Sequence, residues 1–579
     1  PRTQPFALRP RPDGKQRAPY RMTEKTHPIF NPIEGGFNMK KKKLLSAVLA
    51  CVMLFALMAG CSGSKEPSGS TAPSQSGAQE SQDVAEVQYK DSVVIVTSSD
   101  QNYMDGQMNS SNEKILRSVY SSLVKMDPDT SKMVGDLAES WETSEDGLTW
   151  TFHLRHGVKF HNGKELTAKD VKASYDRLLN KDDPVRYTST MSIISACEIV
   201  DDYTVTLSTE TPSAALLPNL LHRANTILDA DYIEKYGKDL GLTAESVNGT
   251  GPYKLATWNV DELMVLEAFD DYFGGAPATK TINIEIVPEA SSRAIALETG
   301  AADIADGLNV DDILRLQDTE GFKVDTFEGI GTHLYQFNCA NEYVSNVKVR
   351  QAIIYAVDME TIVDTLYSAK HETVCDAPLN PNIWGYASQG VAPYDPEKAK
   401  ELLAEAGYPN GFEMSIMVLP SYDKAIESAE LIKDYLAKVG INATIDQVER
   451  AVFNDAFKAT KKGENFPWGM FIMGQGPGTC DADGMRRYYA YEGETNANNY
   501  GWYYNEEVDT LLKEAAAEMD ETERKAKYAR IQEIVWLEDP AAMWMNNRNN
   551  FYCTTDKVEG LKVDARNAVD FTQLRVIAD

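Results

Sequence analysis

From residue 93 onward, stretches with the two-residue periodicity of β-strands alternate with stretches that have the periodicity of helices. Residues 93–96 (VVIV) form a short apolar run, and residues 148–154 alternate apolar with polar side chains. Residues 203–209 and 281–287 alternate in the same way. No internal repeat is found in this part of the chain, and 579 residues suggest two to four domains. The interleaved strands and helices predict an α/β fold.

Residues that begin and end helices support this interpretation. Thr167 is placed to cap a helix with Val171, Tyr175 and Leu178 on one face. A second helix is predicted over residues 397–406, because Asp395-Pro396 precedes it and Gly407 follows it. Further helices are predicted over residues 349–366, 506–519 and 522–538, and Asp146-Gly147 predicts a hairpin turn before the strand at 148–154.

A segment typical of export signals precedes this body. Residues 39–43 (MKKKK) are basic, residues 44–60 carry no charge, and Ala59-Gly60 place small side chains before Cys61. This arrangement predicts a lipoprotein signal peptide over residues 39–60, with Cys61 acylated as the first residue of the mature protein. The alternative is a short transmembrane anchor, because the apolar run lies near the lower length limit of a membrane span.

The segments on either side of this signal are not expected to form a core. Residues 1–38 are rich in Pro, Arg and Gly, and we interpret them as translated leader DNA that is not native to the protein. Residues 61–83 are rich in Ser, Gly, Pro and Gln and are predicted to be a flexible linker between the lipid and the folded body.

The charge of the mature chain limits its partners. From Cys61 onward there are 46 Lys and Arg residues against 84 Asp and Glu residues. Such an acidic surface repels phosphate backbones, so nucleic acid is not an expected partner.

Seven sequence blocks occur in the order typical of one known family. They are residues 137–179 (LAESWETSEDGLTW and onward), 249–255 (GTGPYKL), 287–305 (beginning VPEASSR), 337–338 with 349–358 (FN, then VRQAI and AVD), 394–408 (beginning YDPEKA), 499–501 (NYG) and 538–540 (EDP). Together they span nearly the whole mature chain. The chain therefore resembles the extracellular solute-binding proteins of family 5, the peptide- and nickel-binding components of ABC importers.

This resemblance implies a two-lobed, periplasmic-binding-protein-like fold with hinge strands and an extra subdomain in the first lobe. Lobe one would comprise residues 84–133, 246–329 and 548–579, the subdomain residues 134–245, and lobe two residues 330–547. The lobes would close over a solute by a hinge motion. The resemblance also implies a monomer without cofactor or catalytic residues, whose partners are a small solute and a membrane permease. Most matched motifs are expected to be structural, and Arg350 is expected to form a buried ion pair near Asp358.

The ligand loop of lobe two departs from the family pattern. Peptide-binding relatives place an Asp there for the α-ammonium group, but that position falls near Gly478 in this sequence. Asp481 or Asp483 could substitute for it, or could simply cap the loop. Met473 and Gln475 would line a more neutral pocket, and Trp502 could stack on the solute or pack in the core. A peptide is the expected solute. The alternatives are an oligosaccharide or a nickel complex, or a role in sensing instead of import.

Metal and enzyme alternatives find little support. His153, His156 and His161 are close in sequence, but alternation along a strand points the first two to opposite faces, so no metal site is predicted. No nucleophile elbow, zinc-protease motif or phosphate loop occurs, which leaves a secreted hydrolase as a remote alternative. After Cys61, five cysteines remain, and an odd number leaves at least one unpaired.

Overall fold

The computed structural model describes residues 87–111, 113–188, 190–367, 371–459, 466–476, 478–491 and 499–578. The predicted leader, signal peptide and linker, including Cys61, lie outside these residues. None of the helices in the described ranges has the length and apolar character needed to cross a membrane.

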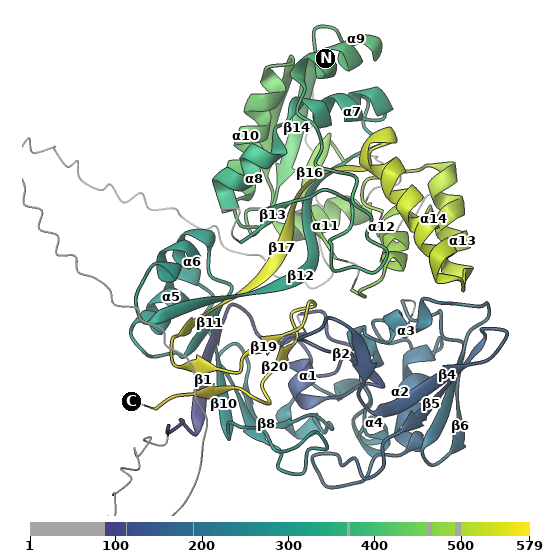
Figure 1. Ribbon diagram of the computed structural model, residues 1–579, viewed down its shortest axis with the longest axis vertical. Coiled ribbons are helices and arrows are strands. Elements are labelled where there is room, and N and C mark those ends of the chain that lie inside the picture. The colour runs from purple at the N-terminus through teal and green to yellow at the C-terminus, as the bar shows by residue number, and fades with distance from the viewer. Residues whose placement is uncertain are drawn as a thin grey trace, which may run out of the picture. The chain divides into compact units, whose positions relative to one another are not determined.

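A large mixed sheet organises the described part of the chain (Figure 1). Its strands follow the order β15 (Ile441–Gln447), β14 (Phe412–Val418), β16 (Met470–Gln475), β12 (Phe322–Phe337), β17 (Ala542–Thr555), β11 (Ile304–Asp306), β1 (Ser92–Thr97), β10 (Thr281–Ile286), β9 (Leu263–Ala268) and β8 (Tyr253–Asn259), with β13 (Thr373–Val374) paired to β17. Because many of these neighbours are distant in sequence, the sheet is held together by long-range pairing.

Two long antiparallel strands, β12 and β17, lie side by side at the middle of this order (Figure 1). They contain 16 and 14 residues, and at about 3.3 Å per residue the longer one extends roughly 50 Å. Their register shifts between Glu328 and Gly331, opposite Arg548 and Asn549. Gly329 is required in this bulge, because a Cβ atom there would lie 2.2 Å from the Arg548 carbonyl oxygen. The bulge coincides with the boundary that we predict between lobes one and two.

Residues of the predicted subdomain form a separate four-stranded sheet in the order β4 (Ala138–Thr143), β5 (Thr149–Leu154), β7 (Thr204–Ser208) and β6 (Ala196–Asp201). Gly147 has φ +68° in the predicted turn between β4 and β5. Helix α2 (Ala168–Leu179) begins at Thr167, and Thr167 and Asp170 form a reciprocal capping box. The predicted strands, turn and capped helix of this region are therefore confirmed.

The remaining elements are mostly helices. They are α1 (Leu116–Val119), α3 (Leu216–Asn219), α4 (Ala230–Tyr236), α5 (Ala290–Glu298), α6 (Val310–Gln317), α7 (Val347–Ala356), α8 (Met359–Tyr367), α9 (Pro396–Glu405), α10 (Ala425–Ala437), α11 (Arg450–Ala459), α12 (Arg486–Tyr489), α13 (Glu506–Ala517) and α14 (Glu521–Glu533), together with the short strands β2 (Val124–Met126), β3 (Met133–Gly135), β18 (Val558–Glu559), β19 (Lys562–Val563), β20 (Val569–Asp570) and β21 (Arg575–Val576). A π-helical turn, Ile534–Glu538, follows α14.

Two predictions in the region of α7 are wrong. The segment 349–366 is not one helix, because the backbone is extended at Val357 and a new helix begins after Asp358, whose carboxylate accepts a hydrogen bond from the Thr361 N–H. Arg350 is buried in an ion pair, but its partner is Asp539 instead of Asp358. Asp358 acts as the cap of α8 and is therefore not available to Arg350.

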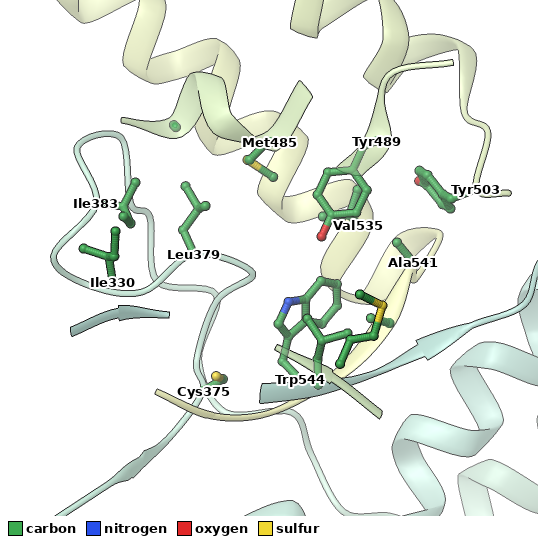
Figure 2. Packing of buried hydrophobic residues seen from close by; sticks show 14 of the residues in the cluster. Ile330, Cys375, Leu379, Ile383, Met485, Tyr489, Tyr503, Val535, Ala541 and Trp544 are labelled. Carbon is green, nitrogen blue, oxygen red and sulfur yellow. The ribbon is translucent and has the colours of Figure 1, made fainter. Parts of the chain in front are cut away.

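One large apolar cluster includes residues from the subdomain, from β12 and β17, and from residues 339–545. Figure 2 shows part of it, including Met485, Tyr489, Val535 and Trp544. Met485 is 1% exposed and Tyr489 2% exposed. The chain that follows β16 is thus fixed at its far end by side chains buried in this core.

Candidate solute-binding cleft

The chain at the end of β16 lies near two cavities. Thr479, Asp483 and Gly484, which follow β16, line one of them, and side chains close to Gly474 of β16 line the other; residue 477 is outside the described residues. β16 pairs with β12 so that Gly474 faces His333 and Gln475 faces Thr332. A Cβ atom at Gly474 would lie 3.6 Å from Arg548, His333 and Tyr422, whereas one at Gly478 would lie 3.5 Å from His222. Four residues of chain therefore connect two distinct environments.

The first environment, the hinge-strand cavity, has a volume of about 380 Å³. It is lined by Ser98, Lys114, Asp306, Gly307, Leu308, Val310, Ile313, His333, Tyr367, Glu372, Ser421, Tyr422, Asp423, Arg548, Asn549, Asn550, Phe551, Tyr552 and Asn567. They include residues of β11, β12, β17, α6 and α8 and residues of the loops beside these elements.

The second environment, the loop cavity, has a volume of about 400 Å³. It is lined by Thr190, Met191, Ser192, Ile193, Glu210, Thr211, Asn219 and His222 of the predicted subdomain, and by Thr479, Asp483, Gly484, Arg486 and Arg487 of the predicted lobe two. Both cavities are within the size range of pockets that bind small ligands.

The polar groups of the hinge-strand cavity include a buried imidazole, a buried carboxyl group and an exposed guanidinium group. Both ring nitrogens of His333 are buried and find no hydrogen-bond partner among the described residues, and burial, followed by the charge of Arg548, lowers the pKa of this imidazole. Burial raises the pKa of Glu372 to about 8, and its carboxyl group accepts a hydrogen bond from Asn546. Arg548 makes no ion pair with a described residue. Such groups are suited to a polar solute that completes their hydrogen bonds.

Met473 and Gln475, predicted to line the pocket, lie on β16 itself. Met473 is 7% exposed and belongs to the large apolar cluster. The Gln475 amide donates to Gln336 Oε1 at 3.2 Å, and its own Oε1 accepts from the Tyr489 hydroxyl at 3.3 Å. Both side chains support the strand, and their role as solute contacts stays a prediction.

The two candidate carboxylates are engaged within the protein. Asp481 is 2% exposed and accepts two hydrogen bonds from Arg524, at 2.6 and 2.8 Å, and one from the Asp483 N–H. Asp483 accepts from the Tyr528 hydroxyl at 3.1 Å, and burial, reinforced by Asp481, raises its pKa. Asp483 lines the loop cavity, but Asp481 does not. The geometry therefore favours loop capping over ammonium binding for Asp481.

Trp502 is packed in the core and lines neither cavity. Its ring centroid lies 5.5 Å from that of Phe457 and 5.3 Å from that of Phe466, and its side chain is 7% exposed. The core packing that we considered for this residue is what the structure shows, and stacking on a solute stays an untested prediction.

The three neighbouring histidines do not converge. His153 is exposed, the His156 ring packs on Tyr203 with centroids 3.8 Å apart, and His161 hydrogen-bonds to the Gly251 carbonyl and the Gly249 N–H. Within the described residues, no group of three potential metal ligands is found. The five described cysteines are all unpaired.

Sequence reasoning missed several residues that line the cavities, namely His222, His333, Glu372, Arg487 and Arg548. They belong to different elements, and no short motif contains two of them. Only the fold brings them together, so the sequence alone carried no signal for them.

The comparison with known families agrees with this geometry. Residues 132–497, more than half of the chain, match the model of the bacterial extracellular solute-binding proteins, family 5. The chain belongs to this family. Family 5 proteins are non-enzymatic solute-binding components of ABC importers that act outside the cytoplasm, so the resemblance found in the sequence and the absence of an enzymatic role are confirmed.

Curated relatives bind different solutes. Heme-binding protein A of Haemophilus influenzae is 34% identical over 447 residues, which cover 73% of this chain and 80% of that protein. The glutathione-binding protein GsiB of Salmonella choleraesuis is 31% identical over 434 residues, covering 74% of this chain and 83% of GsiB.

Solved structures confirm the fold class. The periplasmic binding protein DppA of Helicobacter pylori, in complex with a peptide, is 28% identical and superposes with a TM-score of 0.71, covering 84% of this chain and 98% of DppA. The predicted α/β fold of the periplasmic-binding-protein type is therefore correct, whereas the boundaries of the lobes and subdomain stay predictions.

Proposed function

We propose that this family 5 protein captures a peptide or peptide-like solute in a single cleft that comprises the loop cavity and the hinge-strand cavity. The observation that carries this proposal is that Gly474 and Gly478 lie against different cavities. A Cβ atom at Gly474 would lie 3.6 Å from side chains that line the hinge-strand cavity, whereas one at Gly478 would lie 3.5 Å from His222, which lines the loop cavity. Two cavities of about 380 and 400 Å³ on either side of one strand end suit an extended solute better than a compact one.

The relatives support a peptide as the solute. DppA of Helicobacter pylori was crystallised with a peptide, and glutathione, the solute named for GsiB, is itself a small peptide. The protein would deliver its solute to an ABC permease while anchored to the membrane as a monomer through the lipid on Cys61.

Native mass spectrometry of the full-length protein, freshly purified in mild detergent, tests this proposal. We expect a retained mass that fragments as a peptide, and calorimetry should then show binding of that peptide to protein from which it has been removed. Recovery of heme, an oligosaccharide or a nickel complex as the bound species would overturn the peptide assignment.

The lipid anchor is tested separately. Full-length Cys61→Ser should leave the membrane fraction after a carbonate wash and should bind the recovered solute as the wild type does. Retention of Cys61→Ser in the membrane would show that Cys61 is not the anchor.

A further inference from the structure

His222 presents a hydrogen-bond donor to the loop cavity. Its Nδ1 accepts a hydrogen bond from the Ala224 N–H at 3.2 Å. A neutral imidazole with an accepting Nδ1 carries its proton on Nε2. The Cδ2–Nε2 edge of the ring faces Gly478, because a Cβ atom there would lie 3.5 Å from Cδ2 and 4.0 Å from Nε2. The Tyr187 ring packs edge-on against the imidazole, with centroids 4.7 Å apart, and holds this orientation.

Positive charge surrounds this donor. Burial, followed by the charges of Arg223, Arg566, Arg487 and Arg117, lowers the pKa of His222 to about 3. Arg223 and Arg566 share the carboxylate of Glu113, and Arg566 also pairs with Asp564. Arg487 lines the loop cavity and makes no ion pair with a described residue. The arginines near His222 therefore outnumber the acids that pair with them.

Two acids also line the loop cavity. Asp483 accepts a hydrogen bond from the Tyr528 hydroxyl. Glu210 is exposed, as is Arg487, so solvent and salt screen both of these charges. Gly478, the position at which peptide-binding relatives are expected to carry an ammonium-binding Asp, has no side chain.

We propose that the loop cavity binds a carboxylate of the solute through His222 Nε2–H and the Arg487 guanidinium, so that this protein selects solutes with an acidic end next to Gly478. This inference rests on the proposed cleft and specifies the class of solute. The Nε2–H group of His222 and the guanidinium group of Arg487 would repel an ammonium group next to Gly478, whereas a carboxylate accepts hydrogen bonds from both.

Three peptides that differ only at the amino end test the selection. Free-amine trialanine, N-acetyl-trialanine and N-succinyl-trialanine place a positive, a neutral and a negative group on the same backbone. We expect calorimetry on the full-length protein to give the tightest binding for the succinyl form and the weakest for the free amine. A charge-assisted hydrogen bond corresponds to roughly ten- to a hundredfold in affinity. Tightest binding of the free amine would overturn the proposal.

Variants identify the residues responsible. Arg487→Gln should reduce the preference for the succinyl over the acetyl form about tenfold or more, whereas Lys181→Gln, which removes an exposed charge outside the cavity, should retain it. Gly478→Asp should shift the preference toward the free amine. Its matched control is Gly478→Asn, because both side chains must adopt the same φ of +70° but only Asp adds charge. An unchanged preference in both Arg487→Gln and Gly478→Asp would overturn the assignment.

A measurement without peptides separates this inference from the proposed function. Titration of succinate into ¹⁵N-labelled protein should shift the His222 Nε2–H resonance in a saturable manner, and Arg487→Gln should weaken that response. If none of the three peptides binds, the succinate titration alone decides the carboxylate site, and the mass of the retained solute decides the peptide function. A resonance that does not respond, or that responds equally in Arg487→Gln, would overturn it.

Discussion

The two cavities have similar volumes but are built in different ways. The hinge-strand cavity includes residues of β12 and β17, whose backbone is fixed by the ladder between these strands, and it contains a buried acid, Glu372, and a partnerless imidazole, His333. One side of the loop cavity is formed by a turn that the Asp481–Arg524 ion pair and the buried Met485 hold in place. We infer that the sheet fixes the positions of side chains in the hinge-strand cavity. In the loop cavity, by contrast, substitutions in the loop can change the chemistry of the lining.

The largest expected effect concerns the support of the loop. Asp481→Asn should destabilise the protein by about 3–5 kcal/mol, because it leaves Arg524 buried without its partner charge. Asp483→Asn keeps an oxygen that can accept the hydrogen bond from Tyr528 and should cost no more than about 1 kcal/mol. Urea denaturation of both variants measures the difference. Equal effects would contradict the distinction between a structural carboxylate and a cavity-lining one.

A smaller effect, dependent on pH, is expected in the hinge-strand cavity. The pKa of Glu372 is raised to about 8 in the folded protein, so the folded state holds a proton that the unfolded state releases above its ordinary pKa of about 4.3. This group therefore makes the protein less stable as the pH rises from about 4.3 to about 8, and its effect is complete above that range.

Glu372→Gln should remove this dependence while keeping an oxygen for Asn546. We expect the variant to gain up to about 4 kcal/mol relative to the wild type between pH 4 and pH 8. Urea unfolding at the two pH values measures the gain. A stability difference between variant and wild type that does not change with pH would show that Glu372 is ionised normally.

The smallest expected effect concerns His333. His333→Phe should change the stability of the solute-free protein by no more than about 1 kcal/mol, because neither ring nitrogen has a protein partner to lose. The same variant should lose solute binding if His333 contacts the solute. A large loss of stability, measured by urea unfolding, would mean that His333 is needed for the fold instead.

The parts of the structure that the sequence predicted are those set by local chemistry. Thr167 and Asp146-Gly147 specify a cap and a turn within a few residues, and both were identified correctly, although the part of Asp170 in the cap was not predicted. The break between α7 and α8 was missed because the apolar spacing continues through Val357, and only the Asp358 cap interrupts the helix.

Less of the candidate site than of the fold could be predicted from the sequence. The loop was located by resemblance, but the ion pair that holds Asp481 needs Arg524, which lies 43 residues away in the sequence. His222 and Arg548 approach the loop only because β16, β17 and the subdomain meet there. Such contacts depend on long-range packing, which periodicity and motifs do not encode.

The central claim is that one solute occupies both cavities. Its most direct test is calorimetric titration of the recovered solute against four full-length proteins: wild type, Arg487→Gln in the loop cavity, Arg548→Gln in the hinge-strand cavity and Lys181→Gln outside both. We predict that each of the two cavity variants binds about tenfold or more weakly, and that Lys181→Gln binds like the wild type. Weakening by only one of the two cavity variants would contradict a single cleft.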